Sequence, residues 1–139
     1  IYADALTTGW SNTSYSTTAT LTNTANVLRG TNSIKTNYTS GFGGFRLTKA
    51  APAISTTGYS AIKFSVYTST NSGGFKIRVI LNGSSTVTHT LTLPTTLGVW
   101  TQVEVPLSLL GSPATISSIE LKEYSGKIFE VFFDDIGLF

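Results

Sequence analysis

Short segments in which apolar and polar residues alternate one by one run through most of this chain. In residues 61–67 (AIKFSVY), the apolar residues fall on every second position. Successive side chains of a β-strand point to opposite faces, so this period of two predicts a strand with one apolar face. The same alternation recurs at 75–82, 86–93, 99–105 and 118–124, and further strands are expected at 1–6, 19–24, 33–39, 42–48 and 128–138.

The segments between these runs are rich in Gly, Asn, Ser and Pro, which are typical of turns. No segment of ten or more residues has a convincing 3.6-residue period, and LSLLG at 107–111 fits a single helical turn. About ten strands with one apolar face each predict an all-β fold, a two-sheet antiparallel β-sandwich, for which the jelly roll is a common topology. We expect residues 1–139 to form a single domain.

The composition restricts the possible functions. Nine basic and seven acidic residues are scattered without a basic cluster, so nucleic acid is not an expected partner. No apolar run approaches ~18 residues, so no membrane segment is expected. The chain has no Cys, which excludes disulfides and thiolate metal sites. Its richness in Ser and Thr, with few Lys and Glu, favours a secreted or extracellular domain cut from a larger protein.

Carboxylates lie close to both ends of the chain. The closing segment EVFFDDIGLF places Asp134 and Asp135 between aromatic and aliphatic residues, and Asp4 lies in the opening IYADAL. Ionised acids in an apolar setting need partners. If the first and last strands are adjacent, the three carboxylates suit calcium, which prefers oxygen ligands. The alternative is that the closing aspartates accept backbone N–H groups or pair with Lys35.

Six segments resemble, in order and type, those of the calcium-binding β-jelly-roll carbohydrate-binding modules of secreted polysaccharide-degrading enzymes. They are GWSNTSYS, RGTNSIKTNYT, SGFGGFRL, ISTTGYSAIKFSVY, GVWTQVEVPLSLLG and FFDDIGL. This family often has Trp where the third segment has Phe42. The resemblance implies a noncatalytic, monomeric module that is covalently linked to a catalytic domain and binds a polysaccharide, such as a β-glucan or a related plant or algal glycan. It also implies a structural calcium ion held by Asp4, Asp134 and the 29–33 turn with Asn32.

Sugar recognition needs aromatic rings that stack on pyranose faces and planar polar groups that bind hydroxyls. Trp10, in a polar loop, and Arg78, in the middle of a strand, are the foremost candidates for a solvent-facing site. The other residues predicted to line one outer face of a sheet are Tyr67, Trp100, Gln102, Glu104, Glu120, Lys122 and Tyr124.

The sequence gives little support to catalysis. The only histidine, His89, has the apolar parity of its strand and no Ser or Asp pattern around it, so we expect a buried or strand-end histidine. Glycosidases need two carboxylates at a set separation. Glu104 and Glu120 form such a pair only if their strands are neighbours. Two alternatives to a binding module stay open: a structural or adhesive β-sandwich, and a small jelly-roll lyase or hydrolase.

Overall fold

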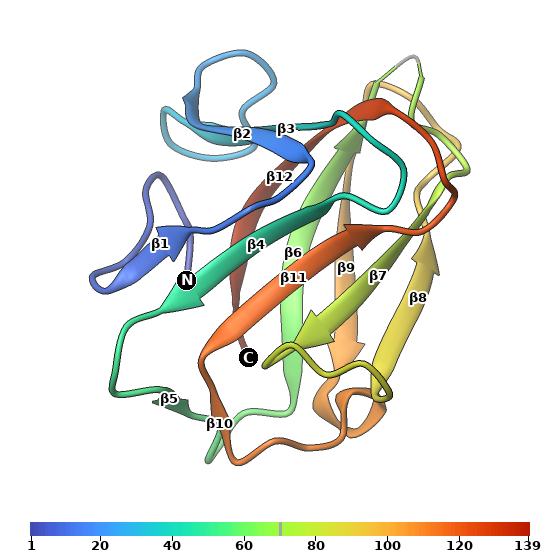
Figure 1. Cartoon of the computed structure of the whole chain (residues 1–139). Helices are drawn as coiled ribbons and strands as arrows, with labels where there is room; N and C mark the ends of the chain where they lie inside the picture. The colour runs from blue at the N-terminus through green and yellow to red at the C-terminus, as the bar shows by residue number, and fades with distance from the viewer. Residues whose placement is uncertain (70) are drawn as a thin grey trace.

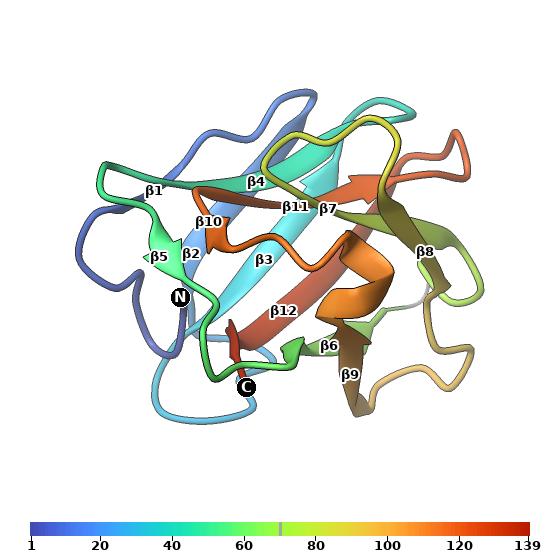
Figure 2. The same cartoon turned by 90° about the horizontal axis from the view of Figure 1, so that it is seen from below.

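The computed structural model describes residues 1–69 and 71–139, which form two five-stranded antiparallel sheets packed face to face (Figures 1 and 2). The first sheet has the order β1 (Trp10–Asn12), β4 (Gly44–Lys49), β11 (Ser118–Glu123), β7 (Lys76–Leu81) and β8 (Thr88–Thr92). The second sheet has the order β2 (Thr17–Asn23), β3 (Ser33–Tyr38), β12 (Phe129–Leu138), β6 (Ala61–Thr68) and β9 (Trp100–Pro106). The short strands β5 (Ile54–Ser55) and β10 (Thr115–Ile116) pair separately. The predicted antiparallel jelly-roll sandwich is confirmed.

The alternating apolar residues form the core between the two sheets. Phe45 of β4 stacks on Phe133 of β12 with ring centroids 5.7 Å apart, and Phe64 of β6 meets Phe133 edge-on at 6.0 Å. All three rings are almost fully buried. Aromatic rings bury large areas and favour such offset or edge-on pairs, so this cluster holds the sheets together.

The helical content also follows the prediction. Leu107–Leu110 form one 3₁₀ turn, which ends at Gly111 in the left-handed conformation (φ 79°). No helix in the described part of the chain is long and apolar enough to cross a membrane.

The two chain ends are adjacent, as predicted, but residues 1–6 do not form a strand. Tyr2 makes isolated bridges with Leu6 and Ile136, and its N–H donates to the carbonyl of Ile136 at 3.0 Å. The chain turns back on itself around Asp4, so the pairing is limited to single residues. The buried Tyr2 hydroxyl donates to the carbonyl of Leu21 at 2.7 Å and fixes the N-terminus to β2.

Trp10 is buried, which contradicts the prediction that it lies in a solvent-facing loop. Its side chain is 8% exposed and belongs to the main core cluster. It begins β1, which pairs with β4 through Trp10 and Lys49. The prediction failed because the polar residues around Trp10 face solvent, while the one large apolar side chain among them turns into the sandwich.

We therefore expect Trp10→Ala to lower the free energy of unfolding by about 3–5 kcal/mol, the usual cost of truncating a large buried aromatic residue. Urea unfolding followed by circular dichroism measures this loss. Trp100→Ala is the matched control, because Trp100 is only half-buried and should cost less. Equal losses in the two variants would contradict the core position of Trp10.

Candidate functional site

The residues predicted to bind sugar on one face are distributed over both outer faces and the core. Arg78, Glu120, Lys122 and Tyr124 belong to the first sheet or follow directly from it, through the paired strands β7 and β11. Tyr67, Trp100, Gln102 and Glu104 belong to the paired strands β6 and β9 of the second sheet. The prediction of a single face is wrong because parity indicates which side of a strand a residue occupies but not which sheet the strand joins.

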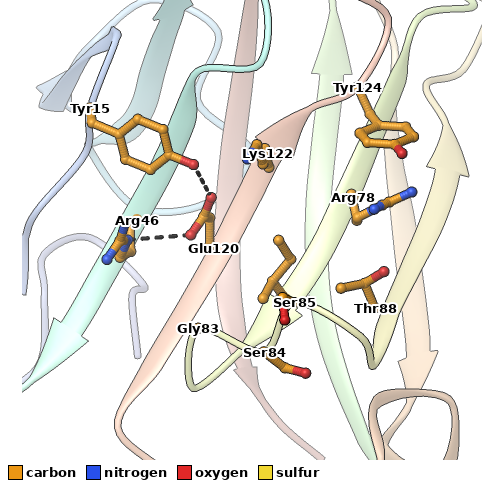
Figure 3. Close-up of a pocket in the computed structure, with 11 residues that line it drawn as sticks. Tyr15, Arg46, Arg78, Gly83, Ser84, Ser85, Thr88, Glu120, Lys122 and Tyr124 are labelled. Carbon is orange, nitrogen blue, oxygen red and sulfur yellow. Dashed lines mark hydrogen bonds and ion pairs between the residues drawn. The ribbon is translucent and has the colours of Figure 1, made fainter.

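A groove of about 350 Å³ lies on the outer face of the first sheet, over β4, β11 and β7 (Figure 3). Tyr15, on the connection between β1 and β2, forms one side. The turn at 83–85, between β7 and β8, and the Arg78–Tyr124 pair form the rest of its rim. Polar and aromatic side chains therefore converge on one hollow surface.

Glu120 is the organising residue of this groove. It is only 5% exposed, and both carboxylate oxygens have partners: the Tyr15 hydroxyl donates to Oε1 at 2.5 Å, and Arg46 Nε lies 3.3 Å from Oε2 (Figure 3). The Arg46 guanidinium carbon also lies 5.1 Å from the centre of the Tyr15 ring. A buried carboxylate is tolerated when it is paired in this way. Glu120 thus holds Tyr15 and Arg46 in place.

Gly44 makes room for this cluster. Its N–H and carbonyl both bond to the backbone of Tyr15, at 3.0 Å each. A Cβ atom at Gly44 would lie 2.6 Å from the Tyr15 ring and 2.7 Å from Glu120 Oε1, which is closer than real Cβ contacts. The sequence prediction missed Tyr15 and Arg46. Their only signal was their place in two segments of the family resemblance, GWSNTSYS for Tyr15 and SGFGGFRL for Arg46.

Arg78 and Tyr124 form the opposite side of the groove. The Arg78 guanidinium carbon lies 3.5 Å from the centre of the Tyr124 ring, and Arg78 Nε donates to Thr90 Oγ1 at 3.2 Å. Stacking on the ring and this hydrogen bond fix the guanidinium plane. The guanidinium has five N–H donors, of which Nε supplies one, so its remaining donors can bind a ligand in the groove.

The outer face of the second sheet has a different character. Tyr67 meets Trp100 at 5.5 Å with a tilt of 52° and meets Phe132 at 5.6 Å with an angle of 87°. These rings pack against one another, and Phe132 is only 3% exposed. Glu104 pairs with Lys63 at 2.9 Å. The face therefore offers half-buried aromatic residues that are already packed together.

The acid pair considered for catalysis is not formed. Glu104 lies on β9 of the second sheet and Glu120 on β11 of the first sheet, so their carboxylates are on different sheets of the sandwich. The sequence hypothesis required neighbouring strands, which the observed topology contradicts. His89 lies half-buried on β8, opposite Val79, at the edge of the first sheet.

The acids at the chain ends accept backbone N–H groups. Asp4 Oδ1 accepts from Thr31 at 2.7 Å and from Asn32 at 2.9 Å, which lowers the pKa of Asp4. The fully buried Asp134 accepts from Leu28 at 3.1 Å and from the N–H of the next residue at 2.8 Å. Its pKa is raised by burial, against the opposing effect of these bonds. This is the alternative that the sequence left open for the closing acids.

The same donors bear on the calcium prediction. The Asn32 side chain presents its Nδ2 to the main-chain carbonyl oxygen of Asp4 at 3.3 Å, whereas the Asp4 carboxylate accepts the N–H groups of Thr31 and Asn32. Within residues 1–69 and 71–139, no three His, Cys, Asp or Glu side chains gather into a possible metal site. Calcium held by Asp4, Asn32 and Asp134 stays a prediction from the resemblance alone.

Thermal melts with chelator and then with excess calcium test that prediction. Bound calcium would raise the melting temperature as its free concentration exceeds the dissociation constant, and Asp134→Ala would remove this response. Because the resemblance implies a structural ion, we expect chelator to lower the melting temperature and calcium to restore it. A melting temperature that responds to neither chelator nor calcium would contradict the site and leave backbone N–H groups as the partners of these carboxylates.

Three tyrosines make stability depend on alkaline pH, and burial raises the pKa of one of them, Tyr38, well above its ordinary value. Burial raises the pKa of Tyr2 to about 12, with help from the charges of Asp134 and Asp4. Burial, followed by the hydrogen bond to Glu120, raises the pKa of Tyr15 to about 12. The folded state thus holds these protons more tightly than the unfolded chain, in which the pKa of tyrosine is about 10.

The stabilisation from the Tyr2 and Tyr15 protons is fully present below about pH 10 and is lost as the pH rises towards about 12. We expect the free energy of unfolding to fall across this window, as measured by urea unfolding at a series of pH values. Tyr15→Phe should show a shallower fall, because one of the protons is removed. An unchanged slope in this variant would contradict the role of Tyr15.

The fold is that of a jelly-roll carbohydrate-binding module, as comparison with solved structures shows. A family 29 carbohydrate-binding module complexed with mannohexaose is 12% identical, with 98% of this chain and 86% of that chain covered and a TM-score of 0.67. The family 11 module of the cellulosomal cellulase Lic26A-Cel5E of Clostridium thermocellum is 15% identical, with 99% and 91% covered and a TM-score of 0.63. The family 11 module from Clostridium thermocellum with a β-1,3-1,4-mixed-linked tetrasaccharide is 18% identical, with 95% and 89% covered and a TM-score of 0.59.

Comparison of the sequence with models of protein families identifies the family of this chain. The model of the expansin-like protein C-terminal domain matches residues 1–139, and the chain belongs to this family. A comparison with curated protein sequences found no match.

Proposed function

We propose that this domain is a noncatalytic carbohydrate-binding module that holds a β-glucan chain in the groove of the first sheet. The observation that carries the proposal is the Arg78–Tyr124 stack facing the Tyr15–Glu120–Arg46 cluster across that groove. A fixed guanidinium can bind two hydroxyls at once, and exposed aromatic surface can receive the C–H face of a sugar. The similar family 11 module with a β-1,3-1,4-mixed-linked tetrasaccharide supports this class of ligand.

The groove chemistry favours binding over catalysis. Glu120 is the one carboxylic acid among the residues that line it, and both of its oxygens are engaged. Hydrolysis of a glycosidic bond by the usual mechanisms needs two carboxyl groups, one of them as acid. The groove also argues against a purely structural or adhesive sandwich, because such a role needs no row of fixed polar donors over a buried acid.

In the parent protein, the module would keep a linked domain close to its polysaccharide. Tethering raises the effective concentration of the linked domain at the substrate, even when each module binds weakly. Membership of the expansin-like C-terminal family favours an expansin-like parent, and the likeness to a module of a cellulosomal cellulase favours a catalytic one. We propose a monomeric module of a secreted protein in either case, since its ligand lies outside the cell.

Isothermal titration with mixed-linked β-glucan oligosaccharides should give a dissociation constant on the order of 10–100 μM, or about −5.5 to −7 kcal/mol. Arg78→Ala should weaken binding about tenfold, because it removes the stacked guanidinium and its donors. Trp100→Ala is the control on the other face and should leave the affinity unchanged. Reducing-end assays of the incubated glycan should detect no new chain ends.

Two outcomes would contradict the proposal. If Trp100→Ala abolishes binding while Arg78→Ala has no effect, the second sheet carries the site. If no member of a wide panel of glucans, mannans and algal polysaccharides binds, the structural or adhesive function takes precedence.

A further inference from the structure

Phe42 has a backbone conformation and an exposure that its own packing does not explain. Its φ is 65°, in the left-handed region that is unfavourable for a residue with a bulky side chain. Its side chain is nevertheless 54% exposed, so it buries little apolar area in return. Non-glycine residues held in such a conformation cluster at functional sites.

A buried acid holds Phe42 in this position. Glu123 is fully buried, and its Oε2 accepts from the N–H of Phe42 at 2.8 Å and of Gly126 at 2.9 Å. Its Oε1 accepts from the N–H of Ser125. The carboxylate thus joins the loop at 39–43 to the loop at 124–127. The close approach of Gly41 to the backbone of Gly126 completes this junction.

The junction places Phe42 beside the groove. Its ring centre lies 6.1 Å from that of Tyr124, with an angle of 81° between the rings, so the two rings form a right-angled corner. Tyr124 in turn carries the Arg78 guanidinium at 3.5 Å. Tyr124 lies at the opposite end of the groove from the turn at Ser84 (Figure 3). Because Phe42 contacts Tyr124, the corner adjoins this end of the groove.

We propose that the Phe42–Tyr124 corner is an additional sugar subsite, which makes the module selective for single, bent β-glucan chains over the flat face of crystalline cellulose. This inference rests on the proposed function. Two perpendicular rings cannot both lie on one plane, whereas a sugar at the corner stacks on one ring and meets the edge of the other. A chain with β-1,3 bends among its β-1,4 links can enter such a corner.

Phe42→Asn tests the subsite, because Asn tolerates the left-handed backbone and lacks the ring. We expect its free energy of unfolding to equal or exceed that of the wild type, and its affinity for a mixed-linked β-glucan hexasaccharide to fall about tenfold. Phe42→Tyr should retain wild-type affinity. Ile128→Asn is the matched control, because Ile128 is 70% exposed just beyond the adjoining loop and lies outside the groove lining. It should bind like the wild type.

Several results would overturn the inference. If Arg78→Ala weakens binding but Phe42→Asn does not, the proposed function stands and the subsite is wrong. If Phe42→Asn unfolds more easily than the wild type, Phe42 has a packing role, and Phe42→Gly, which also relieves the backbone, should confirm that loss. If the wild type binds crystalline cellulose as tightly as it binds the hexasaccharide, the proposed selectivity is wrong. A wild type that binds no glucan would overturn both proposals.

Discussion

The pairing of β11 with both β4 and β7 is the constraint on which the groove depends. In this register Glu120 lies directly opposite Arg46 of β4, while Lys122 lies opposite Arg78 of β7. A slip by one residue would turn Ile119 to the solvent and Glu120 into the core. The buried apolar side of β11 therefore fixes the polar side, and the site inherits its geometry from the core.

The same register also places two positive charges opposite each other, which is unfavourable for stability. Lys122 and Arg78 are like charges on directly opposite positions of neighbouring strands, which is an unfavourable pair. Each cation leans towards an aromatic ring: Arg78 stacks on Tyr124, and the Lys122 amine lies 5.8 Å from the centre of the Tyr15 ring. The two cations are thus drawn towards opposite sides of the groove that both of them line. A pair that stability alone would disfavour is consistent with selection for binding.

The alternation of apolar residues predicted the longer strands, but it missed the short β1, β5 and β10 and did not assign strands to sheets. Ile62, Phe64 and Val66 are buried as their parity indicates. Yet the same rule placed Arg78 and Trp100 on one face, although β7 and β9 belong to different sheets. Strand pairing depends on contacts between distant segments, which a single sequence does not display. The prediction of an exposed Trp10 failed for a related reason. The polarity of the neighbouring residues does not indicate that the Trp10 ring packs into the core.

For the two buried acids, Glu120 and Glu123, the sequence predicts the face of the strand but not the partners of the carboxylates. They are three residues apart, on opposite faces of β11, and parity alone indicates only that they diverge. Glu120 fixes the side chains of Tyr15 and Arg46 at one side of the groove, whereas Glu123 fixes the backbone of Phe42 beyond the other side. Each buried carboxylate is costly to leave unpaired, so each imposes order on a loop or side chain that would otherwise move. One strand thereby fixes both ends of the proposed binding surface, because its two acids take their partners from the neighbouring strand and loops.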